Sequence, residues 1–96
     1  MKANTLDDII TICCTEFNVK INELLKGSRK TEIIWCKKAF VDICIKNFGL
    51  NYRKIADYLS MTTGGIRTIH LKNCTDVFFI ANFEFSLKKC KQLTIQ

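Results

Sequence analysis

The sequence predicts an all-α protein, a compact bundle of five to six helices in a single domain over residues 1–96. Apolar residues recur at helical spacing along most of the chain, and only the segment VFFIANF suggests a strand when it is taken alone. The chain contains no proline, so nothing in it interrupts a helix from within. A length of 96 residues suffices for one hydrophobic core.

Three helices are predicted in the first half of the chain. The first runs from near Thr5 to about residue 16, and a second helix of one or two turns falls within NVKINELLKG. The longest is predicted between Thr31 and Asn47 and ends at NFGLN. Its broad apolar face indicates that it is largely buried; the face consists of Ile33, Ile34, Cys36, Phe40, Ile43, Cys44 and Phe48.

Three more helices are predicted in the second half. Asn51 is suited to cap a helix that runs through Leu59, and Thr62 or Thr63 to cap another from about Gly64 to Asn73. A closing helix over residues 76–92 buries apolar residues at a spacing of four: Phe79, Phe83 and Leu87.

Residues 51–73 have the residue pattern of a helix-turn-helix. A steep helix crossing needs a small residue at the closest approach and hydrophobic residues that face it, and these roles fit Ala56, Leu59, Ile66 and Ile69. Ser60 stands at the turn position that commonly takes glycine because of its positive φ. A generic helical hairpin is the alternative interpretation.

The positive charge is concentrated in the middle of the chain. The net charge is +6, and residues 26–72 carry ten Lys and Arg against Glu32, Asp42 and Asp57. This excess favours a polyanionic partner, with a solvated surface as the alternative. Two acids interrupt the start of the chain where a signal peptide needs an apolar run, and no apolar stretch reaches the ~20 residues that span a bilayer. We therefore expect a cytoplasmic protein without membrane contact.

The second helix of the pair would present its outer face to the DNA major groove. Arg67 is its strongest candidate base reader, because a guanidinium can bridge O6 and N7 of guanine. Gly64 and Gly65 leave backbone N–H groups accessible to a phosphate oxygen, although glycines could equally serve only to loosen the helix. The predicted outward residues are Thr62, Thr63, Gly64, Arg67, Thr68 and Leu71.

Neither a metal site nor a catalytic site is indicated. The six cysteines include no CxxC pair, and in a reducing compartment we expect them to be small core residues. The one histidine, His70, is expected to face inward or to flank the core, and no partner acid or nucleophile is evident for it. We expect a protein that is not an enzyme and takes no cofactor.

From Phe17 to Leu59 the chain resembles, without a gap, the C-terminal DNA-binding domain of the bacterial replication initiator DnaA and its stand-alone relatives. The resemblance rests on FNVKINELL, on SRKTEI before the long helix, and on GLNYRKIADYL at the start of the helix pair. It extends to about Lys72, and the tail is similar only in pattern. It implies a Trp-repressor-like bundle that binds duplex DNA.

The resemblance also implies site residues. The basic loop of the family falls on Lys26, Arg29 and Lys30, and its minor-groove arginine falls on Lys37, with Lys38 beside it. Both lysines are expected outside the apolar face of the long helix, where a merely solvated face is the alternative. The full set of candidate DNA-binding residues is Lys26, Arg29, Lys30, Lys37, Lys38, Arg53, Thr62, Thr63, Gly64, Arg67, Thr68 and Lys72.

The chain departs from the family where the family reads its DNA site. The Asp-His-Thr-Thr-like signature aligns with Thr62, Thr63, Gly64 and Gly65, so the aspartate and the histidine are missing. This predicts weak or altered sequence specificity. No glycine-rich phosphate loop is present, so ATP binding and initiation are not implied for this chain.

A protein-interaction module that keeps the fold without base readout is the alternative function. Phe78 and Phe85 lie off the Phe79, Phe83 and Leu87 stripe, so the closing helix is apolar on more than one face. Those two aromatics are either covered by the first helix or form a dimer or partner surface.

Overall fold

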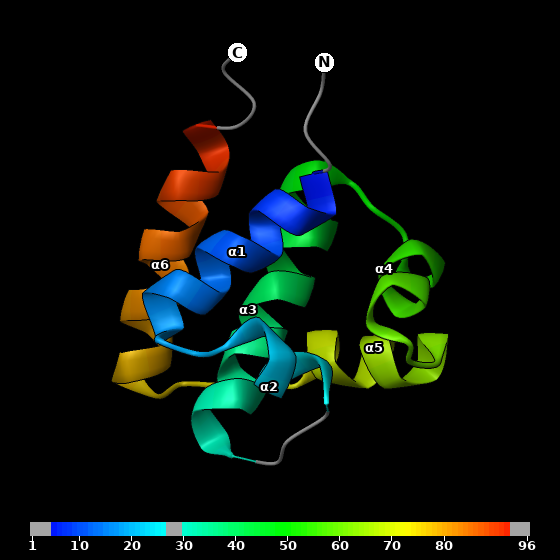
Figure 1. The fold of residues 1–96 in the computed structure, drawn as a ribbon, viewed down its shortest axis with the longest axis horizontal. Coiled ribbons are helices and arrows are strands. Elements are labelled where there is room, and N and C mark those ends of the chain that lie inside the picture. The colour runs from blue at the N-terminus through cyan, green and yellow to red at the C-terminus, as the bar shows by residue number, and fades with distance from the viewer. Residues whose placement is uncertain (1–4, 27–29, 93–96) are drawn as a thin grey trace.

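The longest helix, α3 (Thr31–Phe48), forms the centre of the molecule in the computed structural model, which describes residues 5–26 and 30–92. Every side chain from Lys38 to Cys44 is buried, so this part of the helix is enclosed on all sides. Figure 1 shows α1 (Thr5–Phe17) and α6 (Val77–Lys91) together at one side of the bundle, and α4 (Tyr52–Leu59) and α5 (Thr63–Leu71) at the other. The short helix α2 (Ile21–Leu25) packs against α3.

The predicted fold class is confirmed. The described residues form six helices and no strand, and the order and approximate bounds of all six agree with the sequence pattern. VFFIANF, the one segment with strand character, forms the first two turns of α6. Its inward residue Phe79 is buried, while Phe83 and Leu87 are partly buried against the core.

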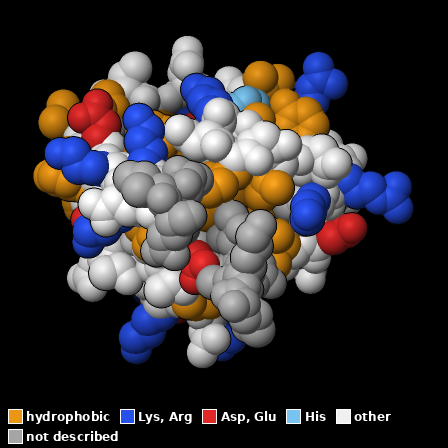
Figure 2. Space-filling view, turned by 90° about the horizontal axis from the view of Figure 1, so that it is seen from above, with side chains coloured by type: hydrophobic (Ala, Val, Ile, Leu, Met, Phe, Trp, Pro, Cys, Tyr) orange, Lys and Arg blue, Asp and Glu red, His pale blue; other side chains and the backbone are white. Residues whose placement is uncertain are grey.

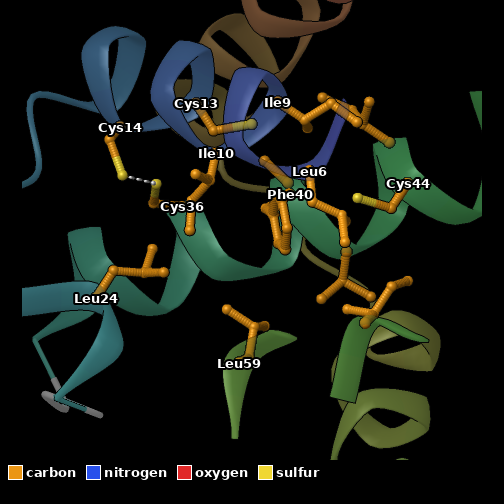
Figure 3. Packing of buried hydrophobic residues seen from close by; sticks show 14 of the residues in the cluster. Leu6, Ile9, Ile10, Cys13, Cys14, Leu24, Cys36, Phe40, Cys44 and Leu59 are labelled. Carbon is orange, nitrogen blue, oxygen red and sulfur yellow. Dashed lines mark hydrogen bonds between the residues drawn. The ribbon is translucent and has the colours of Figure 1, made fainter. Parts of the chain in front are cut away.

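One hydrophobic cluster joins the helices in the described part of the chain. Phe40 on α3 is fully buried and lies between residues of α1, such as Leu6, and Leu59 of α4 in Figure 3. The prediction that the cysteines are small core residues is confirmed for Cys13, Cys14, Cys36, Cys44 and Cys90, and Cys74 is half-buried. The Sγ atoms of Cys14 and Cys36 lie 3.9 Å apart, in thiol contact without a covalent bond.

Side-chain caps and left-handed residues define the ends of the helices. Asn51 Oδ1 accepts from the Lys54 N–H at 2.8 Å, and Asp76 Oδ1 accepts from the Phe78 N–H at 2.8 Å. Gly49 ends α3 at φ 64°, where glycine carries no steric penalty.

None of the helices in residues 5–26 and 30–92 is long and apolar enough to span a membrane.

Candidate nucleic-acid interface

Helices α4 and α5 are joined by a turn of three residues, Ser60, Met61 and Thr62. Ser60 takes the left-handed conformation, with φ 57° and ψ 44°, at the position where the sequence lacks the customary glycine. The Met61 N–H donates to Ala56 O at 2.8 Å and closes the end of α4. A non-glycine residue in this conformation costs roughly 1 kcal/mol, which the hydrogen-bonded turn offsets.

The four residues predicted to fill the contact between the two helices all face inward. Ala56, Leu59 and Ile66 are buried, and Ile69 is partly buried against the same cluster. Ile66 at 0% exposure is the point at which α5 enters the core. Burial of these side chains on one side of α5 fixes which residues of the helix remain outside.

The outer face of α5 carries the residues expected there. Thr62, Thr63, Gly64, Arg67 and Thr68 are exposed, and Leu71 continues the face with 62% exposure. The Thr68 hydroxyl donates to Gly64 O at 3.0 Å, which leaves its oxygen able to accept a further hydrogen bond. Arg67 is the one side chain of this face with a forked cationic group.

Further cations of the helix pair are exposed. Arg53 and Lys54 are exposed at the start of α4, and Lys72 is exposed directly after α5. Asp57 is the exposed acid of the same segment, so residues 51–73 carry a net charge of +3. This is the charge that the pair can present to a polyanion.

The two glycines at the start of α5 have different environments. A Cβ at Gly64 would meet nothing within 4 Å, whereas one at Gly65 would lie 3.2 Å from Thr62 Oγ1 and 3.3 Å from Met61 Cε. The Gly65 N–H donates to Thr62 Oγ1 at 3.0 Å. The cap therefore already occupies one of the backbone N–H groups that were predicted to be accessible to a phosphate oxygen. Gly65 therefore has a structural reason to lack a side chain.

Lys38 does not face outward, and this expectation was wrong. Its side chain is buried between α3 and α5, and Nζ donates to Ile69 O at 3.3 Å and to His70 O at 3.2 Å. Nζ also forms an ion pair with Asp42 Oδ2 at 3.0 Å. With its charge used inside the molecule, Lys38 is removed from the candidate DNA contacts.

Asp42 joins Lys38 to the histidine. Its Oδ1 lies 2.8 Å from His70 Nδ1, and because a carboxylate only accepts, the proton of this bond resides on Nδ1. The prediction that His70 faces inward or flanks the core is confirmed. We call Lys38, Asp42 and His70 the clamp: it binds the C-terminal carbonyls of α5 to α3 and so fixes the angle at which α5 leaves the core.

The remaining basic candidates lie outside the helix pair. Lys37 is half-buried, and that burial lowers the pKa of its ammonium group. Lys26 and Lys30 are exposed at the two ends of the α2–α3 connection, and Lys30 Nζ lies 3.8 Å from Glu23 Oε2. Arg29 lies outside the described residues. The basic loop therefore has described cations at its edges only.

Figure 2 looks down on the molecule from above the view of Figure 1. The Lys and Arg side chains on this visible face stand apart, with hydrophobic and polar atoms between them. Positive charge is thus spread over this side of the molecule rather than gathered in one dense patch. Because the view is turned about the horizontal axis, α4 and α5 lie toward the right of Figure 2, where Lys and Arg side chains also stand apart.

Sequence reasoning missed Asp42. The available signal was the spacing of Lys38 and Asp42, four residues apart on a predicted helix, which commonly brings opposite charges together.

Among the described residues no three His, Cys, Asp or Glu side chains gather as a metal site would require. In comparisons with known proteins, the chain matches no protein-family model, no curated protein and no solved structure.

Proposed function

We propose that the chain is a small, non-enzymatic protein that binds duplex DNA through α4 and α5, acting as a helix-turn-helix, with weak or altered sequence specificity. The observation that carries the proposal is the outer face of α5. Apart from Leu71 it is polar, it is exposed, and Lys72 follows it directly, while Arg53 is exposed on α4 and the clamp holds the far end of α5 on α3.

The proposed role of each residue follows from the chemistry of its side chain. Arg53, Lys54 and Lys72 neutralise phosphates, which supplies affinity without regard to sequence. Arg67 reads a guanine edge in the major groove, and Thr63 and Thr68 offer hydroxyl and methyl groups to neighbouring bases. One forked base reader on the helix agrees with modest specificity.

The resemblance of residues 17–59 to the DnaA C-terminal domain supports the same proposal. That family binds duplex DNA with a helix pair and a basic loop, which this chain would match with Lys26 and Lys30. Thr62 and Thr63 replace the acidic and imidazole side chains of the family signature. We therefore propose DNA binding without preference for the initiator's own site.

The salt dependence of binding to random duplex tests the proposal. About five phosphate contacts give a slope of log affinity against log salt of about −4 to −5. Fluorescence anisotropy of a labelled duplex at nanomolar concentration, titrated with protein up to tens of micromolar at several salt concentrations, provides the slope. A slope near zero, or no binding at low salt, contradicts the proposal and leaves the protein-interaction alternative.

Single substitutions separate backbone contacts from base readout. Lys72→Ala is expected to weaken binding to every duplex and to reduce the slope by about 1, whereas Arg67→Ala mainly lowers the ratio between preferred and random sequences. Lys88→Ala is the matched control, because Lys88 is an exposed lysine on α6, at the other side of the bundle (Figure 1). If Lys88→Ala and Lys72→Ala lowered the affinity for duplex DNA equally, the binding would be assigned to net charge alone.

A further inference from the structure

Two of the buried thiols, Cys14 on α1 and Cys36 on α3, meet where their helices pack together. Figure 3 shows the two side chains pointing toward each other, while the neighbouring Cys13 points elsewhere. The Cys36 thiol donates to Cys14 Sγ, and the two sulfurs lie 3.9 Å apart. The S–S bond of a disulfide is about 2.05 Å long, so the sulfurs need to approach by about 1.9 Å, or about 1 Å each. The pair is therefore close to the geometry of a disulfide in the folded protein.

The two thiols differ in their access to solvent. Cys14 is 4% exposed and lines a surface hollow that α1 and α2 form with the connection between them. Thr15 and Val19 line the same hollow. Cys36 is fully buried and does not belong to this lining. A small molecule in the hollow therefore reaches Cys14 first, and Cys36 only after Cys14.

The hydrogen bond between the thiols also makes them chemically different. Because Cys36 donates its proton to the Cys14 sulfur, the bond lowers the pKa of the Cys14 thiol, although burial acts in the opposite direction. The same bond, followed by burial, raises the pKa of the Cys36 thiol. The thiolate is the form of cysteine that attacks an oxidant, so Cys14 is the more reactive of the two.

We propose that Cys14 and Cys36 form a peroxide-sensitive pair, in which hydrogen peroxide oxidises Cys14 and Cys36 then closes a disulfide between α1 and α3. In the first step the Cys14 thiolate attacks one peroxide oxygen and the O–O bond breaks. Cys14 becomes a sulfenic acid, and the departing hydroxide takes the proton that Cys14 gave up and leaves as water. In the second step the Cys36 sulfur attacks the Cys14 sulfur, and the hydroxyl group leaves as water with the Cys36 proton. The two thiols lose two electrons and two protons, and one peroxide becomes two waters.

The other cysteines lack this combination of features. Cys13 and Cys90 form a second hydrogen-bonded pair of thiols, but both are fully buried and neither lines the hollow. Cys74 is half-buried and is the most accessible thiol of the described residues, so exposure alone would make it the first to react. The identity of the oxidised residues therefore separates the proposed pair from simple accessibility.

Oxidation of the whole chain with a small molar excess of hydrogen peroxide tests the proposal. The mass of the monomer should fall by about 2 Da, the two hydrogens lost in a disulfide, and dithiothreitol should restore it. After the remaining thiols are alkylated, trypsin should release residues 3–20, which contain Cys14, linked to residues 31–37, which contain Cys36. A link to any other peptide, a bond within residues 3–20, or oxidation of Cys74 alone would overturn the proposal. The reaction is measured without DNA, so its outcome is separate from that of the proposed DNA binding.

Single substitutions assign the role of each thiol. Cys14→Ala and Cys36→Ala should each lower the yield of the disulfide at least about tenfold. Cys13→Ala is the matched control, because Cys13 is the neighbouring buried thiol on the same helix, and it should leave the yield unchanged. In Cys36→Ala the sulfenic acid on Cys14 has no partner thiol, so unfolding in dimedone should label Cys14. Equal yields from Cys13→Ala and Cys14→Ala would overturn the assignment, and the linked peptides of the wild-type chain decide the question for any variant that fails to fold.

Two further measurements test the access route and the fit of the bond. Glutathione disulfide is much larger than hydrogen peroxide, so it should form the same bond at least about tenfold more slowly at a thiol as buried as Cys14. The oxidised chain should melt at least about 5 °C above the reduced chain, because the bond joins residues 22 positions apart and restricts the unfolded chain. An equal rate with glutathione disulfide, or an oxidised chain that melts at or below the temperature of the reduced one, would overturn the proposal.

Discussion

Removing the amino group of Lys38 should destabilise the fold strongly, because it breaks the clamp that ties the C-terminal end of α5 to α3. Lys38→Met keeps the length of the aliphatic stem but leaves Asp42, whose side chain is 9% exposed, without its cation. It also leaves Ile69 O and His70 O without the donor that now binds them. Breaking a buried ion pair from one side costs about 3–5 kcal/mol, a large share of the 5–15 kcal/mol typical of a small domain.

Urea unfolding followed by circular dichroism measures this loss. For a chain of this size, a loss of about 3–5 kcal/mol in the free energy of unfolding corresponds to a fall in Tm of at least about 12 °C. Lys37→Met is the matched control, because Lys37 is the neighbouring lysine and is only half-buried; it should change the free energy of unfolding by less than about 0.5 kcal/mol. A Lys38→Met protein whose free energy of unfolding stays within about 1 kcal/mol of wild type would refute the clamp.

The other predictions concern the start of α5 and the core. Gly64→Ala should raise the free energy of unfolding by about 0.5–1 kcal/mol, because alanine favours the helix and its Cβ would meet nothing within 4 Å. Gly65→Ala should bring no such gain, because its Cβ would crowd Thr62 and Met61 at the cap. Urea unfolding compares the stability of the two variants. Thr62→Ala removes the 3.0 Å capping bond and should cost about 1 kcal/mol in the same assay, and no loss would show that the cap is dispensable. Burial, followed by the neighbouring Cys90, raises the pKa of the Cys44 thiol to about 12 from its usual 9.0, so the unfolded chain ionises first and stability falls as pH rises from 9 toward 12. Its contribution is at most about 1.4 kcal/mol per pH unit, and Cys44→Ala should flatten the fall in reducing buffer.

The local elements could be predicted because their signals are local. Asn51, Thr62 and Asp76 each stand where a helix begins and accept from backbone N–H groups there. The spacing of Ala56, Leu59 and Ile66 was sufficient to identify the inner faces of α4 and α5, which also determined the outer face of α5. The order of the six helices follows from the same periodicity.

The orientation of Lys38 could not be predicted because it depends on the tertiary structure. The middle of α3 is buried on all sides. The spacing of its apolar residues therefore does not predict which side of the helix is exposed, or whether a lysine there faces solvent. What draws Lys38 inward is the C-terminus of α5, more than thirty residues away in sequence, whose carbonyls need donors. The exposure of Phe85 likewise depends on which side of α6 the helix α1 covers, and both sides are apolar in sequence.

The central claim is that the outer face of α5 contacts duplex DNA, and a residue-resolved titration tests it most directly. Backbone amide shifts of the labelled protein, followed as a short duplex is added, should move at Thr63, Arg67 and Thr68 and at the flanking Lys72. Amides around Phe85 on α6 should stay in place. Shifts confined to α6, or spread evenly over the exposed lysines with none on α5, would contradict the account.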